Sequence, residues 1–426
     1  MDIRTLKGLR HELAIYMREF RTCIRDRRTR GHLRTYVRGQ LGPLAAKSVE
    51  PMALDAGVAP RTLQQFLSMR KWDEQKLRRR HQHVLQREHG GGNAILVVDE
   101  TTFVKKGDKT VGVKRQYCGT QGKVDNCVAS VHLGYVREGF HALLDGDVFL
   151  PEDWMEDRQR RREAGIPEAL DFRTKPQIAL DLLHRSIEAG VQARWLTADA
   201  LYGRSAAFRN EVEHLGLWYA VEVPCSMTGW TQRPRTGPDG FPLEGEQEAR
   251  EVSKLWKRRG GEPYRIKDTE KGPLVWTVRQ TTFYPNDNGR PGAPLRLVVA
   301  VNTLTGEIKY FYSNVPTEIP LFEVLCVAFS RSHIEQLFEE AKQEVGLDAF
   351  EVRTYRSLQR HLIVSMLSVY FLSEQTRRLR GEKTMVECLS GAQGDPLPAG
   401  SDDDPTGADA PIEEGVEEDR LLAATP

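Results

Sequence analysis

The sequence has few cysteines, and they are not clustered. Its six cysteines are scattered along the chain with no C-x-x-C pair, at positions 23, 118, 127, 225, 326 and 388. This spacing excludes a zinc ribbon and a disulfide framework. It favours a reducing compartment, where thiols remain unpaired.

Long hydrophobic runs are also missing. The longest apolar stretch, residues 362–372, is interrupted by Ser365 and Ser368. It is shorter than the roughly 20 residues that a membrane-spanning helix needs. The first residues, Met1 to Arg4, do not begin the hydrophobic region of a signal peptide. We therefore expect a soluble, cytoplasmic protein that has no membrane partner.

The net charge of +1 averages two ends of opposite sign. Residues 1–90 carry 20 Lys and Arg against 9 Asp and Glu, a net charge of +11. Residues 391–426 carry 1 Arg against 10 acidic residues, a net charge of −9. A basic amino-terminal part indicates a polyanionic partner, for which DNA or RNA is the natural candidate. The alternative is an ordinary solvated helical surface.

At 426 residues, the chain is long enough for two or three domains. A Gly-rich segment at 89–93 is the expected linker after the first of them. Composition predicts a helical basic domain (1–90), a strand-and-helix part (91–224), a β-rich insertion (225–315), a helical part (316–385) and a disordered acidic tail (386–426).

The basic domain contains a pattern typical of a helix-turn-helix. Ala53, Gly57 and Leu63 have its spacing, and Pro60 suits the start of the second helix. In that arrangement Arg61 would point outward, toward a DNA groove. A plain helical hairpin fits the same pattern equally well. A denser basic run earlier in the chain is suited to phosphate contact and includes Arg25 and Arg28.

From residue 94 onward the hydrophobic pattern predicts a mixed sheet. Asp145 and Asp147, on either side of Gly146, are interpreted as residues of a hairpin turn. Three strands in succession, followed by alternating helices and strands, form the order of an α/β, ribonuclease H-like fold. The strands are expected at 94–99, 111–118, 126–136, up to 149, 195–198 and 217–223, and the helices at 174–190 and 204–215.

Three acidic residues stand in contexts that favour metal binding. Asp99 and Asp199 each end an apolar, strand-like run, and Glu335 lies in a long helical stretch. Oxygen ligands favour Mg²⁺ or Mn²⁺, and a pair of such ions held by carboxylates can cut phosphodiester bonds. A strand-end aspartate is also common as a turn or helix cap, so each aspartate alone is ambiguous.

Basic residues accompany these acids. On a helical wheel Arg331 lies roughly 40° and Lys342 roughly 20° from Glu335, so all three share one face where phosphate oxygens could bind. Glu339, one turn further on, fits the spacing nearly as well, and spacing alone does not choose between the two glutamates. Other cations follow Asp99 and would line a DNA channel, although edge-strand lysines also protect against aggregation: Lys105, Lys106, Lys114 and Arg115.

Several ordered motifs within residues 50–375 resemble those of the DDE transposases of bacterial insertion sequences. The resemblance is to the branch with a β insertion before the glutamate. The late signature of that family is tyrosine, two residues, arginine, three residues, glutamate, six residues and lysine. Arg331, Glu335 and Lys342 match it, whereas the tyrosine position falls on Ala328. The resemblance therefore selects Glu335 over Glu339. The other motifs are Val97-Val98-Asp99, Leu150-Pro151-Glu152-Asp153-Trp154, Thr174-Lys175-Pro176 and Ala198-Asp199-Ala200-Leu201-Tyr202-Gly203.

This resemblance implies a metal-dependent enzyme that cuts DNA at element ends and joins the 3′ ends to a target. Asp99 and Asp199 would bind two Mg²⁺ ions, which Mn²⁺ can replace, and Glu335 would complete the second site. The basic domain would recognise double-stranded terminal repeats within a homodimer, and the insertion would help to grip them. Two alternatives remain open. One is a ribonuclease H-like nuclease that only hydrolyses, and the other is a domesticated DNA-binding regulator without turnover.

Overall fold

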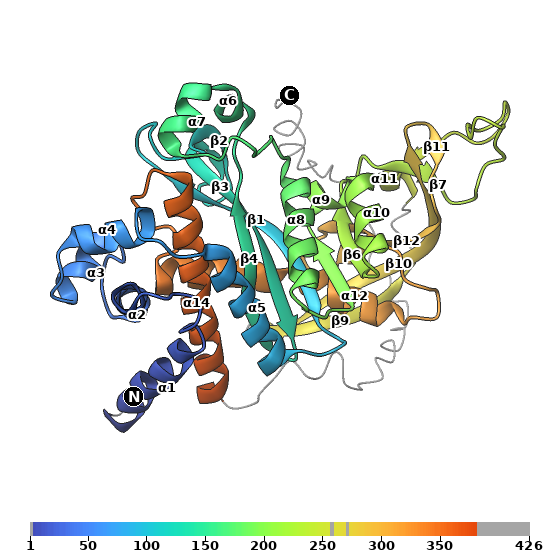
Figure 1. Ribbon diagram of the computed structural model, residues 1–426. Helices are drawn as coiled ribbons and strands as arrows, with labels where there is room; N and C mark the ends of the chain where they lie inside the picture. Colours follow the sequence, from blue (N-terminus) through green and yellow to red (C-terminus); the bar gives the residue numbers. More distant parts are fainter. Residues whose placement is uncertain (1–2, 256–259, 270–271, 381–426) are drawn as a thin grey trace.

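The structure, a computed structural model, describes residues 3–255, 260–269 and 272–380. The acidic tail predicted at 386–426 lies outside the described residues. Within the described ranges, no helix combines the length and the apolar character needed to cross a membrane. Figure 1 shows a twisted sheet at the centre, with the amino-terminal helices gathered at one end and the strands of the insertion at the other.

Strand β1 (Ile95–Val104) is the centre of the sheet. It pairs antiparallel with β3 (Lys123–Arg137) on one side and parallel with β5 (Trp195–Ala198) on the other. β5 pairs parallel with β6 (Trp218–Val223), and β3 pairs antiparallel with β4 (Phe140–Val148). The resulting order, β4-β3-β1-β5-β6, contains five of the six strands predicted from the sequence, and the sixth, β2 (Lys114–Cys118), also pairs antiparallel with β3. β1 continues to Val104, although the sequence predicted that it would end at Asp99. The strand order agrees with the expectation of a mixed sheet that begins antiparallel and continues through helical crossovers.

Helices cover both faces of this sheet. α8 (Lys175–Glu188), α9 (Ala200–Gly203) and α10 (Ala206–His214) share a buried apolar cluster with one face. α12 (Leu321–Phe329) and α13 (Ser332–Glu340) share a second cluster with the other face. The Thr174 capping box starts α8, because the Thr174 side chain and the Gln177 side chain each accept from the other residue's backbone N–H.

The first four residues of β1, 95–98, are apolar without interruption because both faces of the strand are buried there. Successive side chains of a strand point to opposite faces. Leu96 and Val98 belong to the cluster of α8 and α10, whereas Ile95 and Val97 belong to that of α12 and α13. Asp99 continues the second set, so its carboxylate is directed toward α13.

The insertion at 225–315 extends this sheet and does not form a separate one. Its last strand, β13 (Ile308–Ser313), pairs antiparallel with β6, and β12 (Leu295–Asn302) and β10 (Gly272–Asp287) follow in order. β6 would otherwise expose unpaired backbone groups at its edge, and β13 satisfies them. The remaining elements of this part are β7 (Thr228–Trp230), β8 (Arg250–Glu251), α11 (Val252–Leu255), β9 (Glu262–Thr269) and β11 (Arg290–Pro291).

The amino-terminal helices pack against the last helix, α14 (Tyr355–Arg380). Most of their buried apolar side chains belong to the same cluster as those of α14, whereas Val84 and Leu85 belong to the other cluster. Polar contacts tie them together as well. The Tyr36 hydroxyl lies 2.9 Å from Nδ1 of His361, and Nε2 of Gln40 donates to Oγ of Ser365 at 2.7 Å. The helices are α1 (Ile3–Arg18), α2 (Arg27–Leu41), α3 (Val49–Asp55), α4 (Pro60–Ser68) and α5 (Glu74–His89).

The Gly-rich segment at 89–93 is packed against the sheet and so does not act as a free linker. The His89 ring stacks on Phe140 with the ring centroids 3.5 Å apart. The His89 carbonyl accepts hydrogen bonds of 3.1 Å from the Tyr135 hydroxyl and from Nη1 of Arg137. These contacts explain why the sheet and the preceding helices form one body.

α3 and α4 form the helical pair predicted from the spacing of Ala53, Gly57 and Leu63. Ala53 and Leu63 are fully buried, and Gly57 adopts the left-handed conformation that the turn requires, with φ of 66°. Arg61, in the first turn of α4, is exposed. This geometry fits both a helix-turn-helix and a plain helical hairpin.

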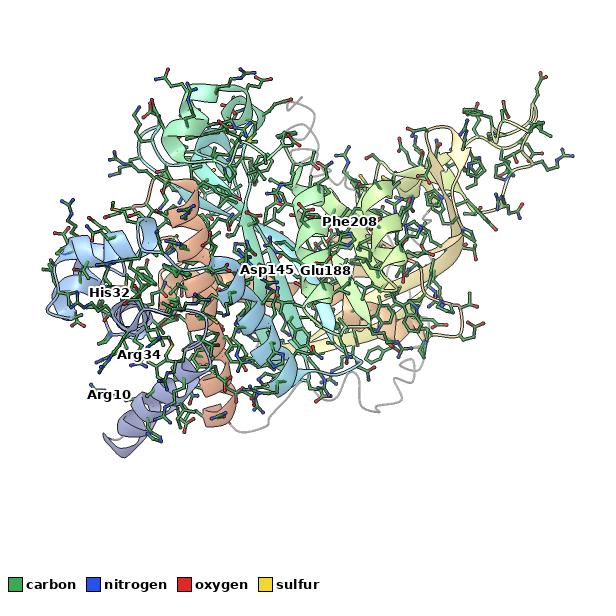
Figure 2. The ribbon with its side chains drawn as sticks, in the orientation of Figure 1. Arg10, His32, Arg34, Asp145, Glu188 and Phe208 are labelled. Carbon is green, nitrogen blue, oxygen red and sulfur yellow. The ribbon has the colours of Figure 1, made fainter. Side chains whose placement is uncertain are left out.

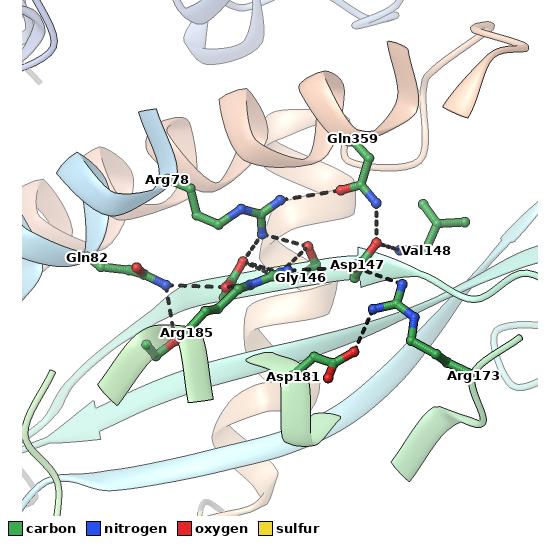
Figure 3. Close-up of polar contacts among 11 residues, drawn as sticks. Arg78, Gln82, Gly146, Asp147, Val148, Arg173, Asp181, Arg185 and Gln359 are labelled. Atoms are coloured by element: carbon green, nitrogen blue, oxygen red, sulfur yellow. Dashed lines mark hydrogen bonds and ion pairs between the residues drawn. The ribbon is translucent and has the colours of Figure 1, made fainter. Parts of the chain in front are cut away.

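Asp145 and Asp147 are buried residues of β4, which corrects the prediction that they belong to a hairpin turn. Arg78 of α5 and Arg185 of α8 both pair with Asp145, and Nη2 of Arg173 donates to Asp147 at 3.2 Å. Figure 3 shows how these arginines and Gln359 of α14 converge on the strand. The two acids can remain buried in a strand because cations from distant segments neutralise them.

The charge state of Asp147 reflects this pairing. Burial by itself would raise the pKa of Asp147, but Arg185, Arg173 and Arg78 bring the pKa below its ordinary value. The network joins α5, β4, α8 and α14, so it fixes the amino-terminal helices and the last helix to the same strand.

We predict that Asp145→Asn destabilises the protein strongly. The change leaves the buried guanidinium of Arg78 without a carboxylate, and breaking a buried pair in this way costs about 3–5 kcal/mol. Asp153→Asn is the matched control, because Asp153 is exposed and pairs with Lys114 at 3.4 Å; its effect should stay below about 1 kcal/mol. Urea unfolding of the two variants measures the difference. Equal midpoints would contradict a stabilising role for the network.

Candidate active site where two parallel strands part

Asp99 and Asp199 lie side by side at the edge where β1 and β5 part. In the parallel pairing of these strands, Val98 is opposite Ala198, and the two aspartates are the next residues on each strand. Neighbouring strands are about 4.8 Å apart. Two stretches separated by a hundred residues therefore bring two carboxylates to one place, as the sequence pattern predicted.

Asp199 also caps a helix, which was the alternative interpretation of this residue. Its Oδ1 accepts from the backbone N–H of Leu201 at 2.9 Å and of Tyr202 at 3.4 Å, at the start of α9. These two bonds use one carboxylate oxygen and fix the orientation of the side chain. Capping and ligand binding are thus compatible at this residue.

The pKa values of both aspartates are raised, because burial and neighbouring carboxylates outweigh the nearby cation Arg331. Burial, and next the charge of Asp199, raise the pKa of Asp99 well above its ordinary value, and Arg331 opposes this only in part. Burial and the charge of Glu100 raise the pKa of Asp199 to about 6. Each ionised carboxylate therefore disfavours the ionisation of its neighbour.

Glu100 is a further acid at this edge that the sequence analysis did not select. It follows Asp99 and points to the opposite face of β1, toward α8 and α9. Its carboxylate lies 2.5 Å from Nζ of Lys175 and accepts from the Tyr202 hydroxyl at 2.9 Å. Lys175 and Tyr202 belong to motifs already noted in the sequence, and those motifs were the available signal for this contact.

Arg331 lies among three carboxylates. It occupies the break between α12 and α13, where its Nη1 donates to Oδ2 of Asp99 at 2.9 Å. Its Nη2 lies 2.7 Å from Oε1 of Glu335, and its Nε lies 3.9 Å from Oε2 of Glu222. Glu335 is consequently linked to Asp99 through the guanidinium, and its side chain is 55% exposed.

Glu222 of β6 is the second acid that the sequence analysis missed. Nζ of Lys309, on the neighbouring strand β13, lies 3.2 Å from Oε2 of Glu222. The only sequence signal was a glutamate placed between two valines in a strand-like run. Lys309 comes from the insertion, so its proximity to this edge follows only from the β6–β13 pairing.

Lys342 does not accompany Glu335 as the helical wheel predicted. α13 passes into a π-helical segment, η1 (Ala341–Val345), and Nζ of Lys342 donates to Oγ1 of Thr120 at 2.8 Å. Burial lowers the pKa of Lys342. The wider π turn rotates this residue relative to an α-helix and directs its ammonium toward the turn between β2 (Lys114–Cys118) and β3.

The other predicted DNA-contacting residues differ in their exposure. Nζ of Lys105 donates to the carbonyls of Asp348 and Phe350, both at 2.8 Å, and burial lowers the pKa of Lys105 to about 8. This ammonium is therefore engaged with a loop. Figure 2 shows basic side chains, including Arg10 and Arg34, on the amino-terminal helices. The exposed members of the predicted set are Lys106, Lys114, Arg115, Arg25, Arg28 and Arg61.

The aspartate pair suits a divalent cation, but the predicted triad is not assembled. Carboxylate oxygens are the ligands of Mg²⁺ and Mn²⁺, and a cation between Asp99 and Asp199 would relieve the repulsion that raises their pKa values. Among residues 3–255, 260–269 and 272–380, no group of three Asp, Glu, His or Cys side chains is arranged to hold a metal ion. Glu335 binds Arg331, which also binds Asp99.

Comparison with known proteins points to enzymes that act on DNA. The sequence model of the family described as DDE superfamily endonuclease matches residues 19–281. This range contains Asp99 and Asp199 and ends before Glu335. A relative from Microchaete diplosiphon, described as a probable transposase for insertion sequence element IS701, is 33% identical over 187 residues. The match covers 43% of this chain and 46% of the relative, so it spans about half the length of that protein.

We predict that Asp199→Asn stabilises the protein at alkaline pH. The pKa of Asp199 is about 6 in the folded state against an ordinary 3.8. Its ionisation therefore removes stability as the pH rises from about 4 to 6, and the full penalty remains above that range. Asparagine also caps helices. The variant should be more stable than the wild type by roughly 1–3 kcal/mol at pH 8.

Thermal unfolding across pH 4–8 measures this effect. The advantage of Asp199→Asn should shrink as the pH falls toward 4. Asp108→Asn, at an exposed position, is the control and should show no such trend. A variant no more stable than the wild type at pH 8 would contradict the proposed repulsion.

Proposed function

The chain belongs to the DDE superfamily of endonucleases, and on that premise we propose that it is the transposase of an insertion sequence. It would cut double-stranded DNA at the element's terminal repeats and join the 3′ ends to a target. The observation that carries the proposal is the pair of buried, mutually repelling aspartates at the point where the pairing of β1 with β5 ends. The strand order, which is that of a ribonuclease H-like sheet, supports it.

Asp99 and Asp199 would hold the divalent cation, and Glu335 would complete a two-ion site once Arg331 releases it. Ions bound there would neutralise the phosphodiester and activate the attacking oxygen. Glu100 would act as a positioning residue, because it anchors both Lys175 and the Tyr202 end of the loop that carries Asp199.

The cations of this region would bind the DNA backbone. Arg331 is half-buried beside Asp99, so its guanidinium could hold a phosphate oxygen there. Lys342 would approach the DNA from the β2–β3 turn. The exposed residues Lys106, Lys114 and Arg115 extend the positive charge along the same end of the sheet. Lys105 would instead support the loop at 348–350.

The amino-terminal helices would recognise the terminal repeats. Arg61 at the exposed start of α4 would contact a groove, and Arg25 and Arg28 would contact phosphates. Because these helices share a core with α14, the recognition surface would be fixed relative to the active site. A homodimer would hold the two ends together, and the insertion would support the grip.

We predict that Asp99→Asn and Glu335→Gln each reduce cleavage to background while end binding is retained. Both changes remove a ligand and keep the size of the side chain. Purified protein with Mg²⁺ and the DNA that flanks its coding region is scored for excision and strand-transfer products. Glu339→Gln, one helical turn from Glu335, is the matched control and should cleave normally. Cleavage by Asp99→Asn would rule out the assignment, and nicks without joined products would indicate a hydrolytic nuclease.

We also predict that the double change Arg25→Gln and Arg28→Gln weakens binding to terminal-repeat DNA. Each lost phosphate contact should lower the slope of log affinity against log salt concentration by about 0.9. Arg87→Gln is the control from the same region, because Arg87 already pairs with Glu19 and Glu88. Fluorescence anisotropy at several salt concentrations gives the slopes. Identical slopes for all three proteins would exclude these arginines from the interface.

A further inference from the structure

Eight charged side chains meet around Asp99, and their formal charges do not balance. Five are carboxylates and three are cations, which leaves a charge of −2 when all are ionised. Glu307 also pairs with Lys309, at 3.6 Å, so the surplus of negative charge around Asp99 is at least this large. The eight residues are Asp99, Glu100, Asp199, Glu222, Glu335, Lys175, Arg331 and Lys309.

The cations of this set are not equivalent. Lys175 forms an ion pair with Glu100, and Lys309 forms an ion pair with Glu222. The guanidinium of Arg331 is the group that binds two of the proposed metal ligands, with contacts of 2.9 Å to Asp99 and 2.7 Å to Glu335. A metal ion that took Oδ2 of Asp99 as a ligand would have to displace Nη1 of Arg331 from that atom.

A receiving carboxylate is already in place for the displaced group. Nε of Arg331 lies 3.9 Å from Glu222, at the outer limit of an ion pair, whereas its contacts to Asp99 and Glu335 are short. Lys309 keeps the Glu222 carboxylate at this edge. A small rotation of the guanidinium would exchange the long contact for a short one and would keep its charge paired.

We propose that Arg331 competes with a divalent cation for Asp99 and Glu335, and that Glu222 receives its guanidinium when the cation displaces it. The inference rests on the proposed function, since it takes Asp99 and Glu335 as ligands. Arg331 thereby holds the two carboxylates near each other in the folded protein and lowers their affinity for the ion. Its release assembles Glu335 with the aspartate pair.

The test measures binding of Mn²⁺ to the full-length protein without DNA, by the electron paramagnetic resonance signal of free Mn²⁺. Arg331→Gln removes the competing charge, so Mn²⁺ should bind about tenfold more tightly than to the wild type, as expected for one close charge at the protein surface. Arg331→Lys keeps the charge but loses the fork that spans two carboxylates, and it should lie between the two. Unchanged or weaker binding by Arg331→Gln overturns the proposal.

Glu222→Gln tests the receiving carboxylate. Without the Glu222 carboxylate, the guanidinium should remain on Asp99, and Mn²⁺ binding should weaken by roughly threefold. In the Arg331→Gln background the same Glu222→Gln change should have a much smaller effect on Mn²⁺ binding, as in a double-mutant cycle. Glu339→Gln removes one carboxylate from the same helix outside the set, and it reports the general effect of charge. A Glu222→Gln effect of equal size in both backgrounds overturns the proposed exchange.

Asp99→Asn separates this inference from the proposed function. If the wild type binds Mn²⁺ and Asp99→Asn does not, the metal site stands, and only the Arg331 variants decide the competition. If Mn²⁺ binding is the same in the wild type and in Asp99→Asn, the metal site itself fails, and the inference fails with it. Circular dichroism of each variant verifies that it is folded.

Discussion

Asp99 is a buried carboxyl group, and the arrangement of the active-site edge depends on the partners that compensate its charge when it ionises. A carboxylate removed from water is stable only where cations and hydrogen bonds replace its hydration. Arg331 supplies the cation from the break between α12 and α13, so both helices are held against β1. The same guanidinium also binds the exposed carboxylate of Glu335.

The protein contains a second set of buried acids, and the comparison shows what distinguishes a structural site from a reactive one. On β4, arginines saturate Asp145 and Asp147, and the pKa of Asp147 falls below its ordinary value. Where the pairing of β1 with β5 ends, burial and neighbouring carboxylates raise the pKa values of Asp99 and Asp199, and the nearby cation Arg331 does not offset them. Unbalanced charge has no structural benefit, which favours a ligand that supplies the missing positive charge.

Patterns within one segment predicted much of the fold and two members of the site. The apolar runs before Asp99 and Asp199 predicted two buried strands, and the parallel pairing of those strands places the residues after Val98 and Ala198 side by side. The strand role of Asp145 was missed because Asp-Gly is a common turn signal, and the arginines that neutralise it lie in distant helices. The same limit applies to Glu222, whose partners Arg331 and Lys309 become neighbours only after the insertion pairs with β6.

The insertion contributes to the active-site edge through that pairing. Because β13 completes the edge of β6, Lys309 lies beside Glu222, and Glu222 lies beside Arg331. A chain of charges thus runs from a strand of the insertion to Asp99. Any movement of β13 relative to β6 would change the partners available to Arg331 and, through them, the freedom of Glu335.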